Sequence, residues 1–132
     1  MIEIANYVLR FGLEVAALVA AAVWGFTLDA STLVRILAGV GVPVALGALW
    51  AVFRIPNDGG RPVIEVAPRI RLLVEAVVLG VATALLFASG RQTWGIVFAA
   101  LIVIHYAIGW RRTAALVVNR QPPPIPEMLR PR

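Results

Sequence analysis

The chain has no cysteine, no lysine and a single histidine among its 132 residues. The absence of cysteine excludes disulfides, thiolate catalysis and Cys-ligated zinc sites. All twelve basic residues are therefore arginine, and charged residues of both signs make up only 14% of the chain. Hydrophobic residues make up 61%, and the mean hydropathy is +0.88. This composition excludes a soluble globular domain and indicates a membrane protein with one domain.

Four apolar stretches are long enough to cross a bilayer, because a membrane helix needs about 20 mostly apolar residues. Their uniform hydrophobicity is typical of helices in lipid, whereas strands of a membrane barrel would alternate. Ser31 or Thr32 is a suitable N-cap for the second stretch, and Ser89 with Gly90 marks the end of the third. The predicted spans cover residues 7–28, 33–53, 70–88 and 93–110, the last with an extension past Arg111 toward residue 118.

The arginines are distributed unevenly about these spans. Ten lie on the side that holds both chain ends, and only Arg35 and Arg91 lie on the other. The positive-inside rule then places both termini in the cytoplasm. The sequence thus predicts an all-α protein of the bacterial cytoplasmic (inner) membrane, with four transmembrane helices in two hairpins. Residues 1–118 would form a four-helix bundle, and residues 119–132 a cytoplasmic tail rich in Pro and Arg. Because the arginines flank apolar segments, we expect them to contact lipid, not nucleic acid.

One motif, Arg-x-x-x-Glu, occurs twice on membrane-length apolar segments, as Arg10 with Glu14 and as Arg71 with Glu75. A charged side chain within hydrocarbon costs at least ~2.5–3.5 kcal/mol, so membrane proteins rarely keep one without a use. The one histidine, His105, belongs to the predicted fourth span. Counted from the flanking arginines, Glu75 and His105 both lie ~9 Å inside the same boundary. We therefore predict a shared polar layer, which consists of Arg10, Glu14, Arg71, Glu75 and His105.

A simpler interpretation of the same residues stays open. Residues four apart face each other on a helix, so each Arg can neutralise its own Glu and extend to the headgroups. A single His on an apolar helix is also often a packing residue with satisfied hydrogen bonds. The sequence alone does not decide between this structural role and a ligand pocket.

Three classes of function follow from the polar layer. The first is a binder of a small molecule or ion, including a transporter. The second is a membrane enzyme such as a cyclase, an isomerase or an epoxide-opening catalyst, in which Glu14, Glu75 and His105 supply the acid and base for a lipophilic substrate. The third is a structural or assembly subunit, whose charges pair with a second copy or with another membrane protein. No motif predicts a cofactor or a metal ion. We favour the first class.

Several short motifs occur along the chain up to about Ser89, namely Asn6-x-x-Leu9-Arg10-Phe11-x-x-Glu14, Trp24-Gly25, Trp50-x-x-Phe53-x-x-Pro56 and Arg71-x-x-x-Glu75. As a set, these motifs resemble the YrdB-like family of small bacterial membrane proteins. The chain departs from the family at Ile55-Pro56-Asn57, where the family has Ala-Pro followed by a basic residue. The resemblance implies the membrane architecture and adds no reaction or ligand.

Overall fold

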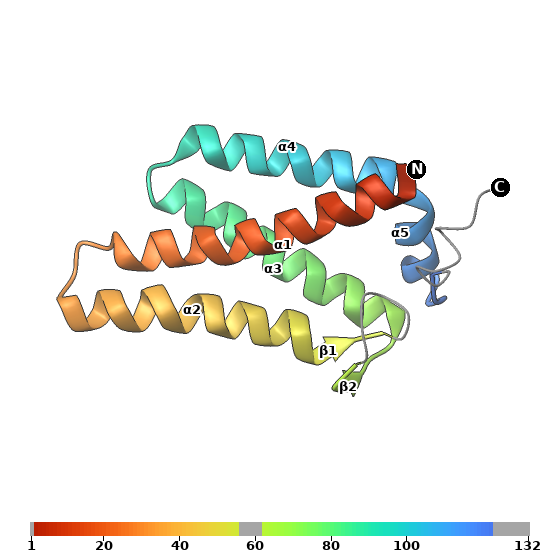
Figure 1. Cartoon of the computed structure of the whole chain (residues 1–132), viewed down its shortest axis with the longest axis horizontal. Helices are drawn as coiled ribbons and strands as arrows, with labels where there is room; N and C mark the ends of the chain where they lie inside the picture. The colour runs from red at the N-terminus through yellow and green to blue at the C-terminus, as the bar shows by residue number, and fades with distance from the viewer. Residues whose placement is uncertain (1, 56–61, 123–132) are drawn as a thin grey trace.

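Long helices dominate the structure and lie side by side (Figure 1). The computed structural model describes residues 2–55 and 62–122 of the chain. In chain order the elements are α1 (Ile2–Phe26), α2 (Thr32–Val52), β1 (Phe53–Arg54), β2 (Ile64–Glu65), α3 (Pro68–Ala88), α4 (Gln92–Ile108) and α5 (Trp110–Val117). Helix α1 packs against α2, α3 and α4, and α3 also packs against α4 and α5. The all-α prediction is therefore confirmed.

The helices follow the predicted spans closely. Helices α2, α3 and α4 begin and end within two residues of the predicted limits. Helix α1 begins at Ile2 instead of residue 7, because Asn6 faces the interior and does not end the helix. The Ser31 hydroxyl accepts a hydrogen bond from Val34 N at 3.3 Å, so Ser31 is the cap of α2. At the end of α3, Gly90 takes the left-handed conformation that a glycine accepts without strain (φ +76°).

The fourth predicted span does not continue past Arg111 as a straight helix. Helix α4 ends at Ile108, and α5 leaves it at an angle of 78°. A side chain at Gly109 would collide with the Asn6 amide of α1, so glycine is what allows this close approach. The backbone N–H and the hydroxyl of Thr113 both donate to Gly109 O, at 3.0 and 3.2 Å. Helix α5 therefore begins directly after Gly109.

Two very short strands, which the sequence did not predict, connect α2 to α3. They pair in parallel, with Phe53 opposite Ile64 and Arg54 opposite Glu65. Val66 N extends the pairing by donating to Arg54 O at 3.0 Å. The strands thus hold the C-terminal end of α2 beside the start of α3. The connecting residues 56–61 and the tail from residue 123 onward lie outside the described residues.

The core is built from small residues of α1 and aliphatic residues of α3. Ala17 and Ala21 are fully buried, and Leu79 and Ala82 pack in the same cluster. Many large apolar side chains on the outer surface are exposed instead, as Leu33 (67%) illustrates. Such a surface is unfavourable in water and suits a lipid environment. Among the residues that the structure describes, three helices are long and apolar enough to cross a membrane, and α4 with α5 makes a fourth if that bent pair is one span.

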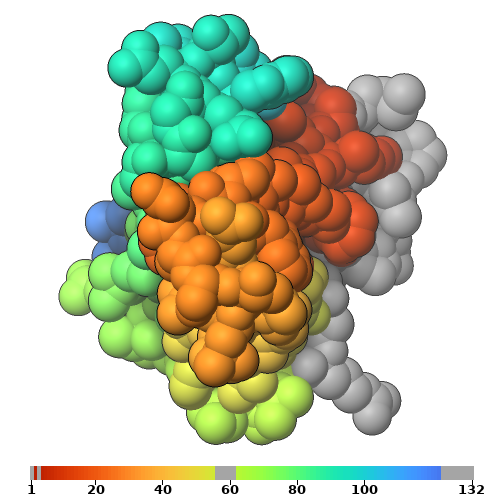
Figure 2. All heavy atoms as spheres, turned by 90° about the vertical axis from the view of Figure 1, so that its left-hand side faces the viewer, coloured from red at the N-terminus to blue at the C-terminus, as the bar shows by residue number. Residues whose placement is uncertain are grey.

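The two helical hairpins turn at the same end of the molecule. Figure 2 looks onto this end, where the α1–α2 turn lies beside the α3–α4 turn. Arg91 lies in the α3–α4 turn, and Arg35 lies in α2, three residues after its first residue. The start of α1, the strands and α5 lie at the other end (Figure 1). We call this the polar end, because it holds the charged cluster described next.

Candidate functional site

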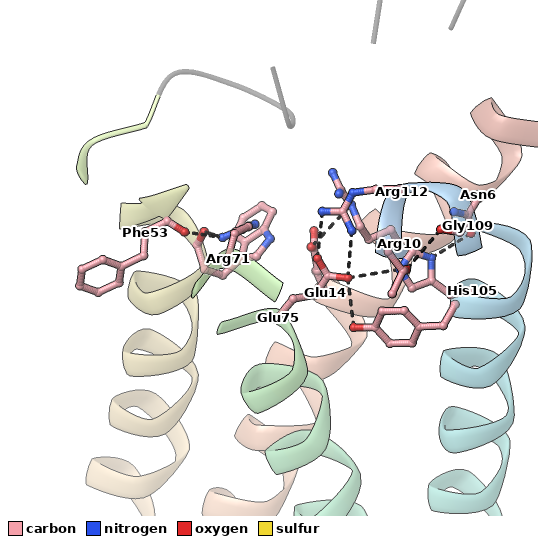
Figure 3. A network of polar contacts seen from close by, with 12 residues as sticks. Asn6, Arg10, Glu14, Phe53, Arg71, Glu75, His105, Gly109 and Arg112 are labelled. Atoms are coloured by element: carbon pink, nitrogen blue, oxygen red, sulfur yellow. Dashed lines mark hydrogen bonds and ion pairs between the residues drawn. The ribbon is translucent and has the colours of Figure 1, made fainter. Parts of the chain in front are cut away.

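Glu75 lies at the centre of a buried cluster at the polar end (Figure 3). Its side chain is fully buried, and both of its carboxylate oxygens are bonded. Arg112 of α5 donates to Glu75 Oε2 at 3.1 Å, and the Tyr106 hydroxyl donates to Oε1 at 3.2 Å. His105 Nε2 lies 3.3 Å from the same Oε1. A buried carboxylate is stable only when charge and hydrogen bonds compensate its lost hydration, and Glu75 has both.

His105 connects this cluster to the start of α1. Its second ring nitrogen, Nδ1, lies 2.8 Å from Asn6 Oδ1. Both ring nitrogens are thus engaged, and the side chain is almost wholly buried (2% exposed). The chain of contacts runs from Asn6 of α1 through His105 of α4 to Glu75 of α3 and Arg112 of α5. We call these four residues and Tyr106 the Glu75 cluster.

The second Arg-x-x-x-Glu pair does not act as a local ion pair. Arg71 is buried, and its Nη1 donates to Trp50 O and Phe53 O, both at 2.7 Å. These carbonyls stand at the end of α2, where the helix leaves them without intrahelical partners and where a cation is favoured. Arg71 thus binds the end of α2, and the arginine that binds Glu75 comes from α5, which differs from the simpler interpretation in which each arginine pairs with its own glutamate.

In the first Arg-x-x-x-Glu pair, Arg10 and Glu14 lie within ion-pair range of each other. Arg10 Nε lies 3.9 Å from Glu14 Oε1, which is within ion-pair range but too long for a hydrogen bond. Glu14 is 5% exposed, and its Oε1 accepts no hydrogen bond of normal geometry from the described residues. The Trp50 indole lies beside the carboxylate, and its buried Nε1 also has no hydrogen-bond partner of normal geometry there. Glu14 is therefore buried without the saturation that Glu75 has.

All five residues of the predicted polar layer are buried at the polar end, but they divide into groups. Glu75 and His105 touch directly, Glu14 is within electrostatic range of Glu75, and Arg71 serves the end of α2. Within residues 2–55 and 62–122, three or more His, Asp or Glu side chains nowhere gather in a way that would hold a metal ion. Apart from these contacts, the site offers the Glu14 carboxylate as an acceptor beside the Trp50 indole as a donor.

Sequence reasoning missed three members of the Glu75 cluster. Asn6 belongs to a sequence motif but not to the predicted polar layer, and Tyr106 belongs to neither. Arg112 is predicted only as one of the ten arginines on the side that holds both chain ends. One signal pointed to it, because residues seven apart share a helix face and Arg112 follows His105 by seven positions. The 78° bend changes the path of the chain but keeps both side chains directed at Glu75.

Comparisons with known proteins place the chain in a family. The model of the family described as "Protein of unknown function (DUF2568)" matches residues 8–103. The curated "Uncharacterized protein YrdB" of Bacillus subtilis (strain 168) is 34% identical over 110 residues, which cover 81% of this chain and 89% of that protein. No solved structure gives a significant match. The match to YrdB confirms the resemblance inferred from the motifs, and the chain belongs to the DUF2568 family of YrdB-like proteins.

Proposed function

We propose that this protein binds a small molecule or ion in its polar layer and that Glu14 is the group that contacts the ligand. The observation that carries the proposal is the contrast between the two buried glutamates. Both oxygens of Glu75 are bonded by side chains of the protein, whereas Glu14 Oε1 is buried without a hydrogen bond of normal geometry from the described residues, although the Trp50 indole lies beside the carboxylate. Leaving a buried acceptor unsatisfied costs ~1–3 kcal/mol, and more for a charged group. A ligand that donates to Glu14 would recover that free energy.

The chemistry of Glu14 limits what the ligand can be. An ionised carboxylate only accepts hydrogen bonds, so the ligand presents a cation, an N–H or an O–H to Oε1. The Trp50 Nε1–H lies beside the same carboxylate and can only donate, so it directs its N–H toward Glu14 as the ligand would. Transport across the membrane is one use of such a site. An acid–base enzyme is less favoured, because both ring nitrogens of His105 are already engaged within the protein.

A screen of purified protein tests the proposal. We expect at least one compound among alkali cations, alkylamines and long-chain alcohols to raise the unfolding temperature, since a ligand at 100 times its Kd adds about 2.7 kcal/mol. Glu14→Gln should bind that compound at least about tenfold more weakly, because a hydrogen bond to a charged group contributes ~1.5–3 kcal/mol. Glu65→Gln removes the same charge from an exposed strand residue and should bind as wild type does. Equal binding by the Glu14→Gln protein would contradict the proposal.

The membrane topology is part of the proposal. The arginine bias supports four passes through the bacterial cytoplasmic membrane with the polar end in the cytoplasm. The chain has no native cysteine, so a cysteine introduced at one position is the only thiol of the protein that a maleimide can label. In intact cells with the outer membrane permeabilised, Ser31→Cys should react with a membrane-impermeant maleimide, and Val63→Cys, which is 75% exposed at the polar end, should react only after lysis. The reverse pattern would overturn this orientation.

A further inference from the structure

Helix α5 is held in place by its inner face. Leu116 is fully buried, and Arg112, four residues earlier and therefore on the same face, binds Glu75. At the other end of the helix, Arg69 Nε donates to Val117 O at 2.6 Å, and Asn119 Oδ1 accepts from Arg69 N at 3.4 Å. These contacts fix α5 against α3. Because α5 turns 78° away from α4, it lies along the surface of a bilayer that α4 crosses.

The outer face of α5 is apolar and exposed. Trp110 is 60% exposed, Val117 52% and Val118 56%. Residues at positions i and i+7 share one side of a helix, and Val118 directly follows the helix, so these three side chains mark an exposed apolar stripe along α5 and its C-cap. A stripe of this kind, on a helix with few buried residues, is typical of helices that lie in the membrane interface.

Arginines flank this stripe. The Arg111 guanidinium lies 5.6 Å from the centre of the Trp110 ring, and both side chains are exposed. Arg120 follows the helix and is exposed as well. The arginines at the opposite end of the molecule are occupied differently, since Arg35 donates to Leu28 O at 2.7 Å and Arg91 to Ser89 O at 3.3 Å. Arg35 also lies beside exposed apolar side chains, such as Leu33 (67%) and Leu37 (62%), but its guanidinium donates to a main-chain carbonyl of the adjoining turn.

We propose that α5, with Arg111 and Arg120, is a binding surface for anionic phospholipids. Trp110, Val117 and Val118 enter the boundary between headgroups and acyl chains, and the two guanidinium groups bind lipid phosphates. The lipid is the occupant that matches both features, because a phosphate is complementary to the arginines and the acyl chains cover the stripe. The surface lies outside the ligand site proposed at Glu14, and the proposal holds whichever side of the membrane the polar end occupies.

Lipid binding to the full-length protein in detergent, followed by native mass spectrometry, tests the charge requirement. Wild type should bind dioleoylphosphatidylglycerol more tightly than dioleoylphosphatidylcholine. Each arginine near a membrane surface contributes about fivefold in affinity, so the Arg111→Gln/Arg120→Gln variant should lose about 25-fold for the anionic lipid. The matched variant Arg35→Gln/Arg91→Gln carries the same net charge and should stay within about twofold of wild type, because both of these guanidinium groups are engaged by main-chain carbonyls. Equal losses in the two variants, or no lipid preference in wild type, would overturn the proposal.

A second measurement tests the position of the stripe and does not depend on the arginine variants. A spin label on Val117→Cys, in the protein reconstituted in phosphatidylcholine–phosphatidylglycerol vesicles, should lie ~5–10 Å below the headgroup level by power saturation with oxygen and a nickel chelate. A label on Val63→Cys, which is exposed on the strand connection at the same end, should be fully accessible to the nickel chelate. A Val117→Cys label that is equally open to the aqueous reagent would refute the interfacial position of α5.

Discussion

Replacing Glu75 by leucine is expected to lower the free energy of unfolding by about 3–5 kcal/mol, because it removes one partner of a buried ion pair and leaves the other behind. Arg112 would lose its carboxylate, and the Tyr106 hydroxyl and His105 Nε2 would lose their shared acceptor. Helix α5 would also lose one of the contacts that tie it to α3. Unfolding by sodium dodecyl sulfate in mixed micelles, followed by circular dichroism, measures the change.

The control for this variant is Glu65→Leu. Glu65 is an exposed residue of β2, and a substitution at such a position normally changes stability by less than about 0.5 kcal/mol. A loss of less than about 1 kcal/mol for Glu75→Leu, close to the control, would mean that the Glu75 cluster is not the tie between α3, α4 and α5 that its contacts indicate.

A second large effect is expected where α1 and α2 approach most closely. A Cβ added to Gly25 would collide with the backbone of Ala38 and Gly39, which cannot move aside as a side chain can. The Gly25→Ala variant should therefore lose about 1–3 kcal/mol or more, the usual cost of overpacking. The same measurement of unfolding in mixed micelles applies.

Gly41→Ala is the matched change on the partner helix. A Cβ at Gly41 meets no atom within 4 Å, and alanine is the better helix former by about 1 kcal/mol, so this variant should be as stable as wild type or more stable. If Gly25→Ala were as stable as Gly41→Ala, then α1 and α2 would not be in contact at this point.

The helices could be predicted because their signals are local. Length, hydropathy, the Ser31 cap and the Ser89-Gly90 stop define α2 and α3 to within two residues. The bend at Gly109 could not be predicted, since glycine also occurs in straight membrane helices, as Gly80 and Gly41 do here. What distinguishes Gly109 is the Asn6 amide of α1 packed against it, and that contact arises only from the tertiary structure.

For the site, too, the sequence predicts local features but not the contacts that arise from the tertiary structure. Burial of Arg10, Glu14, Arg71, Glu75 and His105 at one end followed from helix periodicity and arginine spacing. The partner of each charge did not follow, because residues four apart on one helix are only the nearest candidates. Arg71 is directed to the carbonyls at the end of α2, and Arg112 replaces it at Glu75 because the 78° bend places α5 over α3. The two Arg-x-x-x-Glu motifs thus have the same sequence pattern but differ in their contacts.

That difference is the central claim: Glu75 bonds side chains of α4 and α5, whereas Glu14, the proposed ligand contact, is held less firmly within the protein. Two double-mutant cycles run side by side test it most directly. The cycle between Glu75 and Arg112, each replaced by leucine, should give a coupling of at least about 1.5 kcal/mol, because their 3.1 Å contact is buried and hydrogen-bonded. The cycle between Arg10 and Glu14, 3.9 Å apart without a hydrogen bond, should give less than about 0.5 kcal/mol. Equal couplings in the two cycles, or a larger one between Arg10 and Glu14, would contradict this division of roles.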